Sequence, residues 1–517
     1  AKDFFRRLED ASAEIPLPVW TGELYLEKHQ GTYTSQAANK AYNRICEREL
    51  HRLEFLGAAA SCLCPDYRWN ADRVRRIWET VLLYQFHDIL PGSSIDRVYR
   101  ETGPSYEEVL KEIRALSAEA LDSLRSHPDA RPAASLLNLS PFDNPEPSPE
   151  TGICPETPAR AYCFTEYTPL SGGKGSRSEK SGEDYLLDNG RLTVRFSAGG
   201  TVLSVRDGSS GREFLSGESN RLFVYRDPCD GWEVPDRAEN PPEEELRAIS
   251  SSCGRKGETA FLSFLYRFRG SEIRQTAFLA PESGRIEWET EADWREPNVL
   301  LRAEFHPAAR SEYAVCGVPF GELARPTMHR DSWEAAKREV CFQGYCDLSD
   351  GTFGGAVLSD CKYGIDVRDC VLSLALLRAP TFPGKHADIG HHAFRYAFLP
   401  HKGGTENVRP EAFRMRAPAE EIPFLPPLTA SFVSAEGLLA ASVKPAENGN
   451  GIVVRLYNPT DRPGTAKVRF APELGISSFR KANLLEGPEE EIPDGILRYG
   501  PFEVVTLLVE TESGRRE

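Results

Sequence analysis

The stretch that decides the fold is Leu192-Thr193-Val194-Arg195-Phe196, followed by Gly199-Gly200 and then by Val202-Leu203-Ser204-Val205. Apolar and polar side chains alternate in both halves, and a period of two is typical of a β-strand with one face against a core. The Gly-Gly pair favours a tight turn, because glycine adopts backbone angles that other residues avoid. We therefore predict a β-hairpin at this point of the chain.

Short strands of the same kind recur from this hairpin to the C-terminus. They are predicted at residues 273–279, 286–290, 300–305, 355–358, 371–377, 394–399, 452–457, 466–470 and 503–509. Strands at this density, separated by Gly/Pro turns and not by helices, pack as antiparallel sheets in a sandwich. The absence of a βαβ series from the pattern also argues against a parallel sheet or a barrel.

The first quarter of the chain has the period of α-helices instead. Apolar side chains recur at three- and four-residue spacing over residues 37–60, and again from about Asn70 to Pro91, where proline must end a helix. A third helix is predicted to open at Ser105 and run to Leu124, because Ser105 and Glu108 have the spacing of a capping box. We expect a three-helix bundle.

These patterns predict an α+β, multidomain protein. An N-terminal three-helix bundle would occupy residues 1–127, and a linker with the first strands would occupy residues 128–184, where Pro and Ser recur and residues 171–182 are rich in Gly and Ser. A large antiparallel β-sandwich domain would follow over residues 185–430. A small terminal β-sandwich would complete the chain over residues 431–517.

Composition limits the classes of function. The 517 residues include 62 Lys and Arg against 78 Asp and Glu, a net charge of −16, which argues against binding to nucleic acid through its phosphates. The sequence shows neither an apolar run that would cross a membrane nor a secretory leader, and the twelve cysteines are scattered as buried reduced thiols would be. We expect a soluble, cytoplasmic protein. Because Ala1 opens directly into a helical pattern without Met, we also expect the chain to have been cut from a longer one.

The first candidate site is the pair His87-Asp88, which lies where the second predicted helix ends, just before Pro91-Gly92. Adjacent side chains on a helix point about 100° apart, so the two would flank a pocket rather than line one face. The imidazole could coordinate a metal while the carboxylate accepts hydrogen bonds from a substrate hydroxyl. The plainer alternative is that a histidine at a helix C-terminus interacts with the helix dipole and the last carbonyl groups.

Three further clusters are weaker candidates. The segment from His386 through Asp388 to His391 and His392 has the density of a metal site, or of a solvated loop; His329-Arg330-Asp331 has an H-x-D spacing on a surface turn. The segment of residues 23–29 alternates like a short strand. Its polar residues are Glu23, Tyr25, Glu27 and His29. The favoured interpretation is that Leu24 and Leu26 pack inward and this polar set is solvated.

At two of these motifs the sequence resembles a known family. Glycoside hydrolase family 38, the zinc-dependent retaining α-mannosidases, has a signature very similar to Gln85-Phe86-His87-Asp88-Ile89-Leu90-Pro91-Gly92-Ser93-Ser94. Residues 22–27 and 31–36 resemble the segment that precedes the family's helical bundle. Residues 300–305, 360–364, 377–381 and 394–397 resemble its C-terminal mannosidase domain, most closely in the bacterial and cytosolic branch.

The resemblance implies roles for particular residues. His87 would be a zinc ligand, and Asp88, the residue assigned to catalysis, would hold sugar hydroxyls or support the metal. His29 and Tyr33 would lie on the wall of the sugar pocket. The family hydrolyses α-mannosidic bonds by double displacement with retention, using one carboxylate as nucleophile and a second carboxyl group as acid. Its nucleophile and other zinc ligands come from an upstream domain, so this chain alone is expected to be inactive.

Two alternatives remain open at this stage. The chain could be a non-catalytic carbohydrate-binding or assembly module, or its substrate could be a small mannosyl acid held by Arg378 and Lys385. Arg378 is therefore included among the substrate-binding candidates. The expected partners are a mannose-containing oligosaccharide or small mannoside and the missing N-terminal catalytic domain, with no nucleic acid and no membrane; a homo-oligomer is left open.

Overall fold

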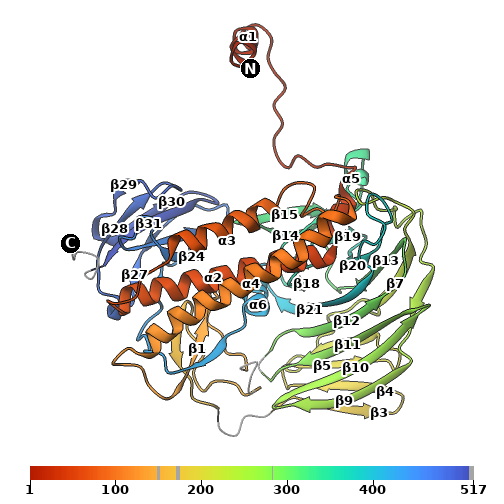
Figure 1. The fold of residues 1–517 in the computed structure, drawn as a ribbon. Coiled ribbons are helices and arrows are strands. Elements are labelled where there is room, and N and C mark those ends of the chain that lie inside the picture. The colour runs from red at the N-terminus through yellow and green to blue at the C-terminus, as the bar shows by residue number, and fades with distance from the viewer. Residues whose placement is uncertain (148–151, 171–174, 282, 512–517) are drawn as a thin grey trace.

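A computed structural model describes residues 1–147, 152–170, 175–281 and 283–511. The helical region crosses the front of the molecule, with a large β-domain on one side of it and a small β-domain on the other (Figure 1). The predicted α+β, multidomain class is confirmed. The Gly- and Ser-rich stretch predicted at residues 171–182 begins with four residues that lie outside the described part.

Three helices form the bundle, and a fourth stands apart from it. The bundle consists of α2 (Ala37–Leu63), α3 (Ala71–Tyr84) and α4 (Asp96–Arg125). The separate helix is α1 (Lys2–Ser12), which an extended segment connects to the body (Figure 1). As predicted, α3 begins next to Asn70, its N-cap, whose side chain accepts a hydrogen bond from the Arg73 amide at 3.2 Å.

The predicted start of the third helix at Ser105 is wrong. Helix α4 begins nine residues earlier, at Asp96, and continues through Pro104 and Ser105. The reason is burial: Thr102, Tyr106 and Val109 form one buried stripe, and the Tyr106 ring stacks on Tyr42 at 5.5 Å between ring centroids. Packing of this stripe outweighs the missing amide of an exposed proline.

Three antiparallel sheets build the large β-domain around one core. The central sheet has nine strands in the order β15 (Gly321–Pro326), β14 (Tyr313–Val318), β17 (Tyr345–Ser349), β18 (Phe353–Ser359), β21 (Gly390–Lys402), β12 (Ile286–Trp294), β11 (Ser271–Leu279), β10 (Thr259–Phe268) and β9 (Ser250–Lys256). The second has six, in the order β16 (Val340–Cys341), β19 (Gly364–Arg368), β20 (Val371–Arg378), β13 (Val299–Phe305), β7 (Arg221–Arg226) and β8 (Glu244–Leu246). The third is β3 (Arg177–Ser181), β4 (Asp184–Asp188), β5 (Leu192–Phe196) and β6 (Val202–Asp207), in which β5 and β6 are the predicted hairpin.

Smaller sheets complete the fold. A three-stranded sheet joins β1 (Ala134–Asn138) with β2 (Cys163–Glu166) and β22 (Glu420–Pro423). The terminal domain contains β24 (Leu439–Pro445), β25 (Ile452–Tyr457), β31 (Val504–Thr511), β28 (Ile476–Ala482) and β29 (Pro488–Glu491), with two-stranded pairs of β23 (Val433–Ser434) with β27 (Arg469–Phe470) and of β26 (Gly464–Lys467) with β30 (Ile496–Tyr499). Two short helices, α5 (Ser332–Ala336) and α6 (Val408–Arg416), and the 3₁₀ turns η1 (Gln30–Tyr33), η2 (Pro472–Leu474) and η3 (Pro493–Gly495) lie between strands or precede α2.

Two further expectations can be compared with the structure. Within the described residues, no helix combines the length and the apolar character needed to cross a bilayer. No disulfide joins any of the twelve cysteines, all of which lie in the described part.

Candidate functional site

The pair His87-Asp88 lies on the loop between α3 and α4, at the exposed end of the bundle. The side chain of His87 is 78% exposed, and its Nε2 lies 3.3 Å from Oδ2 of Asp88. The backbone of this loop is fixed by hydroxyl groups: Ser94 Oγ donates to the Asp88 carbonyl at 2.8 Å, and Tyr99 Oη lies 3.2 Å from the same oxygen. A rigid loop therefore presents both polar side chains to solvent.

A buried lysine joins this loop to the start of α2. Lys40 Nζ donates to the carbonyls of Ser35, Leu90 and Pro91 at 2.5, 2.9 and 3.1 Å. Burial lowers the pKa of Lys40 to about 7, and the nearby Asp388 opposes this shift. At Gly92, φ is +96°, and a Cβ atom there would lie 2.4 Å from the Ser35 carbonyl oxygen. Only glycine permits this approach.

Arg378 forms the centre of the same cluster, and its side chain is completely buried. Nε and Nη2 pair with the two carboxylate oxygens of Asp227 at 2.7 and 3.0 Å, and Nη1 donates to Ser35 Oγ at 3.2 Å. A Cβ atom at Gly31 would lie 1.9 Å from Nη1, which requires glycine there. A direct contact of Arg378 with a sugar or with a substrate carboxylate does not fit this arrangement, since the guanidinium already binds Asp227. Its role in this geometry is to position η1 and its neighbours.

The histidine cluster at residues 386–392 does not form the metal site considered from its sequence. The carboxylate of Asp388 accepts hydrogen bonds from the amides of Gln36 and Ala37 at 3.0 and 2.6 Å and so caps the first turn of α2. His392 Nε2 lies 2.9 Å from the backbone carbonyl of Asp388, while His386 is exposed and pairs with Asp96 at 3.2 Å. Asp388, His392 and His386 therefore each make a separate contact and do not share one.

The H-x-D spacing at residues 329–331 also has a structural explanation. Asp331 Oδ1 accepts a hydrogen bond from the Glu334 amide at 2.8 Å and is the N-cap of α5. Across all described residues, no group of three or more His, Cys, Asp and Glu side chains could hold a metal ion.

The segment of residues 23–29 differs from the prediction. Residues 23–28 lie in the described part but pair with no strand. Leu24 and Leu26, expected to pack inward, are exposed, at 75% and 58%, while Glu23 and Tyr25 are half-buried; Glu27 and His29 are exposed, as predicted. Tyr25 Oη donates to the Glu339 carbonyl at 2.5 Å, and Glu23 forms an ion pair with Arg325. The groups of the β-domain that face this segment are polar. Tyr25 and Glu23 therefore form hydrogen bonds and an ion pair with them, and the two leucines remain exposed.

The remaining predicted site residues lie at or beside η1. His29 precedes η1 and is exposed, while Tyr33 ends it and is half-buried; burial raises the pKa of the Tyr33 phenol. The structure thus brings the segments of residues 29–36, 88–92 and 378–388 together through Ser35, Lys40 and Arg378. Sequence reasoning missed the positioning roles of Lys40, Asp227 and Asp388, because each acts on residues far away along the chain.

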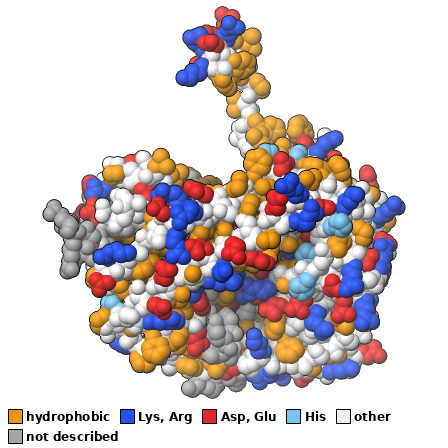
Figure 2. Space-filling view, viewed as in Figure 1, with side chains coloured by type: hydrophobic (Ala, Val, Ile, Leu, Met, Phe, Trp, Pro, Cys, Tyr) orange, Lys and Arg blue, Asp and Glu red, His pale blue; other side chains and the backbone are white. Residues whose placement is uncertain are grey.

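The residues present do not form a zinc site by themselves. A catalytic zinc is held by three protein ligands, and this loop offers one exposed imidazole with one carboxylate beside it. Exposed apolar side chains also gather where the N-terminal segment meets the body (Figure 2). On that segment, Trp20 is exposed and lies 5.8 Å from Trp333 between ring centroids.

Comparison with known proteins identifies three matching domain families along the chain. The alpha mannosidase middle domain matches residues 27–124, the glycosyl hydrolases family 38 C-terminal domain matches residues 187–386, and the family 38 C-terminal beta sandwich domain matches residues 439–507.

Similar whole proteins are α-mannosidases. Human alpha-mannosidase 2C1 is 31% identical over 98% of this chain and 52% of its own length, and the alpha-mannosidase of Saccharomyces cerevisiae is 30% identical over 90% and 44%. The chain thus spans about half the length of these curated relatives. A solved family 38 protein from Enterococcus faecalis has the same fold, with a TM-score of 0.77 at 17% identity over 98% of this chain and 73% of that one. The protein therefore belongs to glycoside hydrolase family 38, and carries the middle, C-terminal and β-sandwich domains of that family.

Proposed function

We propose that this chain supplies the middle and C-terminal part of a zinc-dependent retaining α-mannosidase that hydrolyses α-mannosidic bonds in glycans or small mannosides. The observation that carries the proposal is the exposed pair His87-Asp88, held on a rigid loop by Ser94 and Tyr99. Because both groups face solvent, a metal ion and a sugar held by another domain could reach them. The relatives named α-mannosidase support the reaction type.

In this proposal the site is completed by a domain outside the present sequence. His87 Nε2 would be one zinc ligand, and Asp88 would accept hydrogen bonds from sugar hydroxyls; His29 and Tyr33 would lie nearby on the wall of the sugar pocket. A retaining glycosidase needs two carboxyl groups about 5–5.5 Å apart. In this proposal the other domain supplies the nucleophile, as the resemblance to the family implies. When bound, zinc would orient the sugar hydroxyls.

The exposed apolar side chains suggest where that domain docks. Leu24, Leu26 and Trp20 are each more than half exposed, and they lie on the segment that leads into η1. Apolar side chains in such a group are typical of a surface that another protein part covers. We propose that the N-terminal catalytic domain covers them, in a protein of the cytoplasm.

The test compares the chain alone with the product of a longer reading frame, if one extends upstream of the codon for Ala1. We expect the chain alone to retain less than one zinc per molecule and to leave an aryl α-mannoside intact, because it offers too few ligands. The longer product should bind one zinc and be active, and His87→Ala should abolish both. One tightly held zinc in the chain alone would contradict this proposal.

The non-catalytic alternative makes a different prediction for mannose. A carbohydrate-binding module would bind mannose in a titration of the chain alone, and His87→Ala would leave that binding unchanged. A start codon directly before Ala1 would favour the same alternative.

A further inference from the structure

A large cavity lies between the bundle, the central sheet and the terminal domain. Its volume is about 890 Å³, which is in the range of small-molecule sites. Helices α2 and α3 form one wall, the turn between β14 and β15 and the end of α6 form another, and β24 and β25 close the third side. Aromatic side chains line it, among them Trp78, Phe413 and Tyr457. His87, Asp88 and Arg378 are not among the lining residues.

Most of the charged groups in the lining have partners. Arg44 pairs with Glu47 at 3.2 Å, and Arg409 pairs with Glu322 at 2.7 Å. Lys444 lies between Glu486 and Glu447, at 2.6 and 3.0 Å from their carboxylates. Arg48 is bound by Glu49 at 3.0 Å. Each of these four cations therefore already has a carboxylate partner.

Two arginine side chains in the same lining form no ion pair with a carboxylate of the described residues. Arg416 forms no hydrogen bond or ion pair with any described residue, and its buried Nε is unpartnered. The Nε of Arg455 is also buried and unpartnered, and its Nη2 donates only to the Leu484 carbonyl, at 3.2 Å. Both side chains are partly exposed, but in each the Nε is buried and has no hydrogen-bond partner, which costs free energy that a bound anion could recover.

The neighbouring groups do not neutralise them. Burial, and after it the positive charge of Arg44, lower the pKa of Arg416 to about 10, against the opposing effects of Tyr363, Glu47 and Tyr457. Glu54 interacts with Arg455, and burial raises the pKa of this carboxyl group to about 7, so it is mostly protonated below that pH. Its carboxylate already accepts a hydrogen bond from Trp78 Nε1 at 2.8 Å.

We propose that this cavity binds a sugar-sized phosphate monoester, with its phosphate between Arg416 and Arg455. A guanidinium fork matches phosphate oxygens, and a dianion supplies the negative charge that two unpartnered cations lack. The aromatic walls would contact the carbon face of a sugar ring, and the volume accommodates a body of that size. The proposal does not depend on the mannosidase activity proposed above.

The test is calorimetric titration of the chain with a hexose 6-phosphate near pH 6.5, above the second pKa of the phosphate at about 6 and below the pKa of Glu54 at about 7. The free hexose, a hexuronate and inorganic phosphate serve as separate probes. We expect saturable binding of the hexose phosphate, weaker binding of the monoanionic hexuronate and of phosphate alone, and none of the neutral hexose. Rising salt should weaken the binding.

Arg416→Gln and Arg455→Gln should each weaken the binding about tenfold or more, since each loses charge-assisted hydrogen bonds. The matched control is Arg267→Gln, an exposed arginine on β10 that pairs with Glu272 and lies outside the cavity; its affinity should be unchanged. Unliganded Arg416→Gln should melt no lower than the parent chain, because it removes an unpaired buried charge.

Three results would overturn the proposal. They are the absence of saturable binding at millimolar hexose phosphate, equal affinity in both cavity variants and the parent, and binding of the hexuronate or the free hexose as tight as that of the phosphate ester.

Discussion

Glu54 on α2 is a buried carboxyl group whose titration should be visible in the stability of the protein. Burial raises its pKa from 4.5 to about 7, opposed by the hydrogen bond from Trp78 and by Lys444. Between these two values the folded state binds more protons than the unfolded state, so this group makes the free energy of unfolding fall as pH rises through that window.

We expect Glu54→Gln to remove this dependence while keeping an acceptor for Trp78 Nε1. The variant should match the parent near pH 5 and exceed it at pH 8 by up to about 3 kcal/mol, since one pKa unit corresponds to about 1.4 kcal/mol. Urea denaturation at several pH values measures this. The exposed Glu108→Gln, also on a bundle helix, is the control and should show no such trend. A constant difference between Glu54→Gln and the parent would contradict the assignment.

Gly92 holds the His87 loop against η1 by close approach as well as by its backbone angle. Gly22 offers a matched comparison, because its φ is also positive, at +108°, but a Cβ there would meet nothing within 4 Å. We expect Gly92→Ala to cost about 2 kcal/mol more than Gly22→Ala, because only the former forces atoms apart. Thermal unfolding of both variants measures this, and equal losses would show that backbone angle alone matters.

At the level of single residues, the sequence predicted where the candidate motif lies but not which side chains hold it in place. His87 and Asp88 stand in a local motif, so their position at the end of a helix could be predicted, whereas their exposure to solvent is a finding of the structure. Asp388 caps a helix whose first residue lies 351 positions away, and Arg378 bonds Ser35 across 343 positions. No local pattern encodes partners at such separations, which only the packed fold creates.

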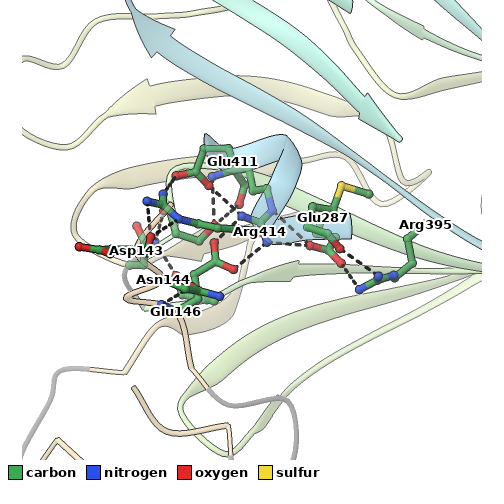
Figure 3. Close-up of polar contacts among 12 residues, drawn as sticks. Asp143, Asn144, Glu146, Glu287, Arg395, Glu411 and Arg414 are labelled. Atoms are coloured by element: carbon green, nitrogen blue, oxygen red, sulfur yellow. Dashed lines mark hydrogen bonds and ion pairs between the residues drawn. The ribbon is translucent and has the colours of Figure 1, made fainter. Parts of the chain in front are cut away.

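Arg285, at the start of the chain segment leading into β12, ties three parts of the molecule together through ion pairs. Its side chain is 6% exposed and contacts Glu146 in the connection after β1, Glu287 on β12 at 3.2 Å and Glu411 on α6 at 2.8 Å. Figure 3 shows how the network extends to Arg395 and Arg414, which pair with Glu287 and Glu411 at 3.1 and 2.7 Å. The guanidinium group of Arg285 thus pairs with three carboxylates.

We expect Arg285→Met to lower the free energy of unfolding by about 3–5 kcal/mol, because it leaves the buried Glu146 without its counter-charge and removes one of the two cations paired with Glu287 and with Glu411. The control is Arg295→Met, which breaks an ion pair with Asp293 between side chains that are both about half exposed or more; it should cost less than about 1 kcal/mol. Denaturant titrations of both variants measure the difference. A small effect at Arg285 would mean that water or nearby groups neutralise these carboxylates.

At the level of elements, strands were easier to predict than the ends of helices. The alternation at Leu192–Phe196 coincides with β5, and the strands predicted at 371–377 and 452–457 agree closely with β20 and β25. Alternation of apolar and polar residues directly indicates that one face of a strand is buried. The start of α4 could not be predicted from Ser105, because the helix extends to bury Thr102 against Asn39 of α2, a contact at 3.2 Å that lies outside any local window.

One end of the helical bundle shares an apolar core with the terminal sandwich, while the rest of the bundle has a core of its own that includes Leu50, Ile77 and Ile113. Phe55 on α2 is fully buried, and its ring lies 5.5 Å from Phe164 and 5.2 Å from Phe432 between centroids. One apolar cluster contains Phe55 and residues of α4 together with Val443, Val454 and Val509 of the terminal sheet. The large β-domain has a different cluster, which includes Leu262 and Trp288. Sequence periodicity divides the chain into helical and β regions. The apolar cores do not follow that division, because one of them contains residues of both helices and strands.

This arrangement predicts that the terminal sandwich unfolds together with α2, apart from the large β-domain. Phe55→Ala should cost about 3–5 kcal/mol and should reduce the hydrogen-exchange protection of amides in both α2 and β25. Leu262→Ala, a comparable truncation in the other core, should reduce protection in β10 and β11 and leave β25 largely unchanged. If instead Phe55→Ala lowered protection in α2 alone, the sandwich would fold without the helix. If both variants lowered all regions equally, the molecule would be one cooperative unit, and the two clusters would share a single unfolding transition.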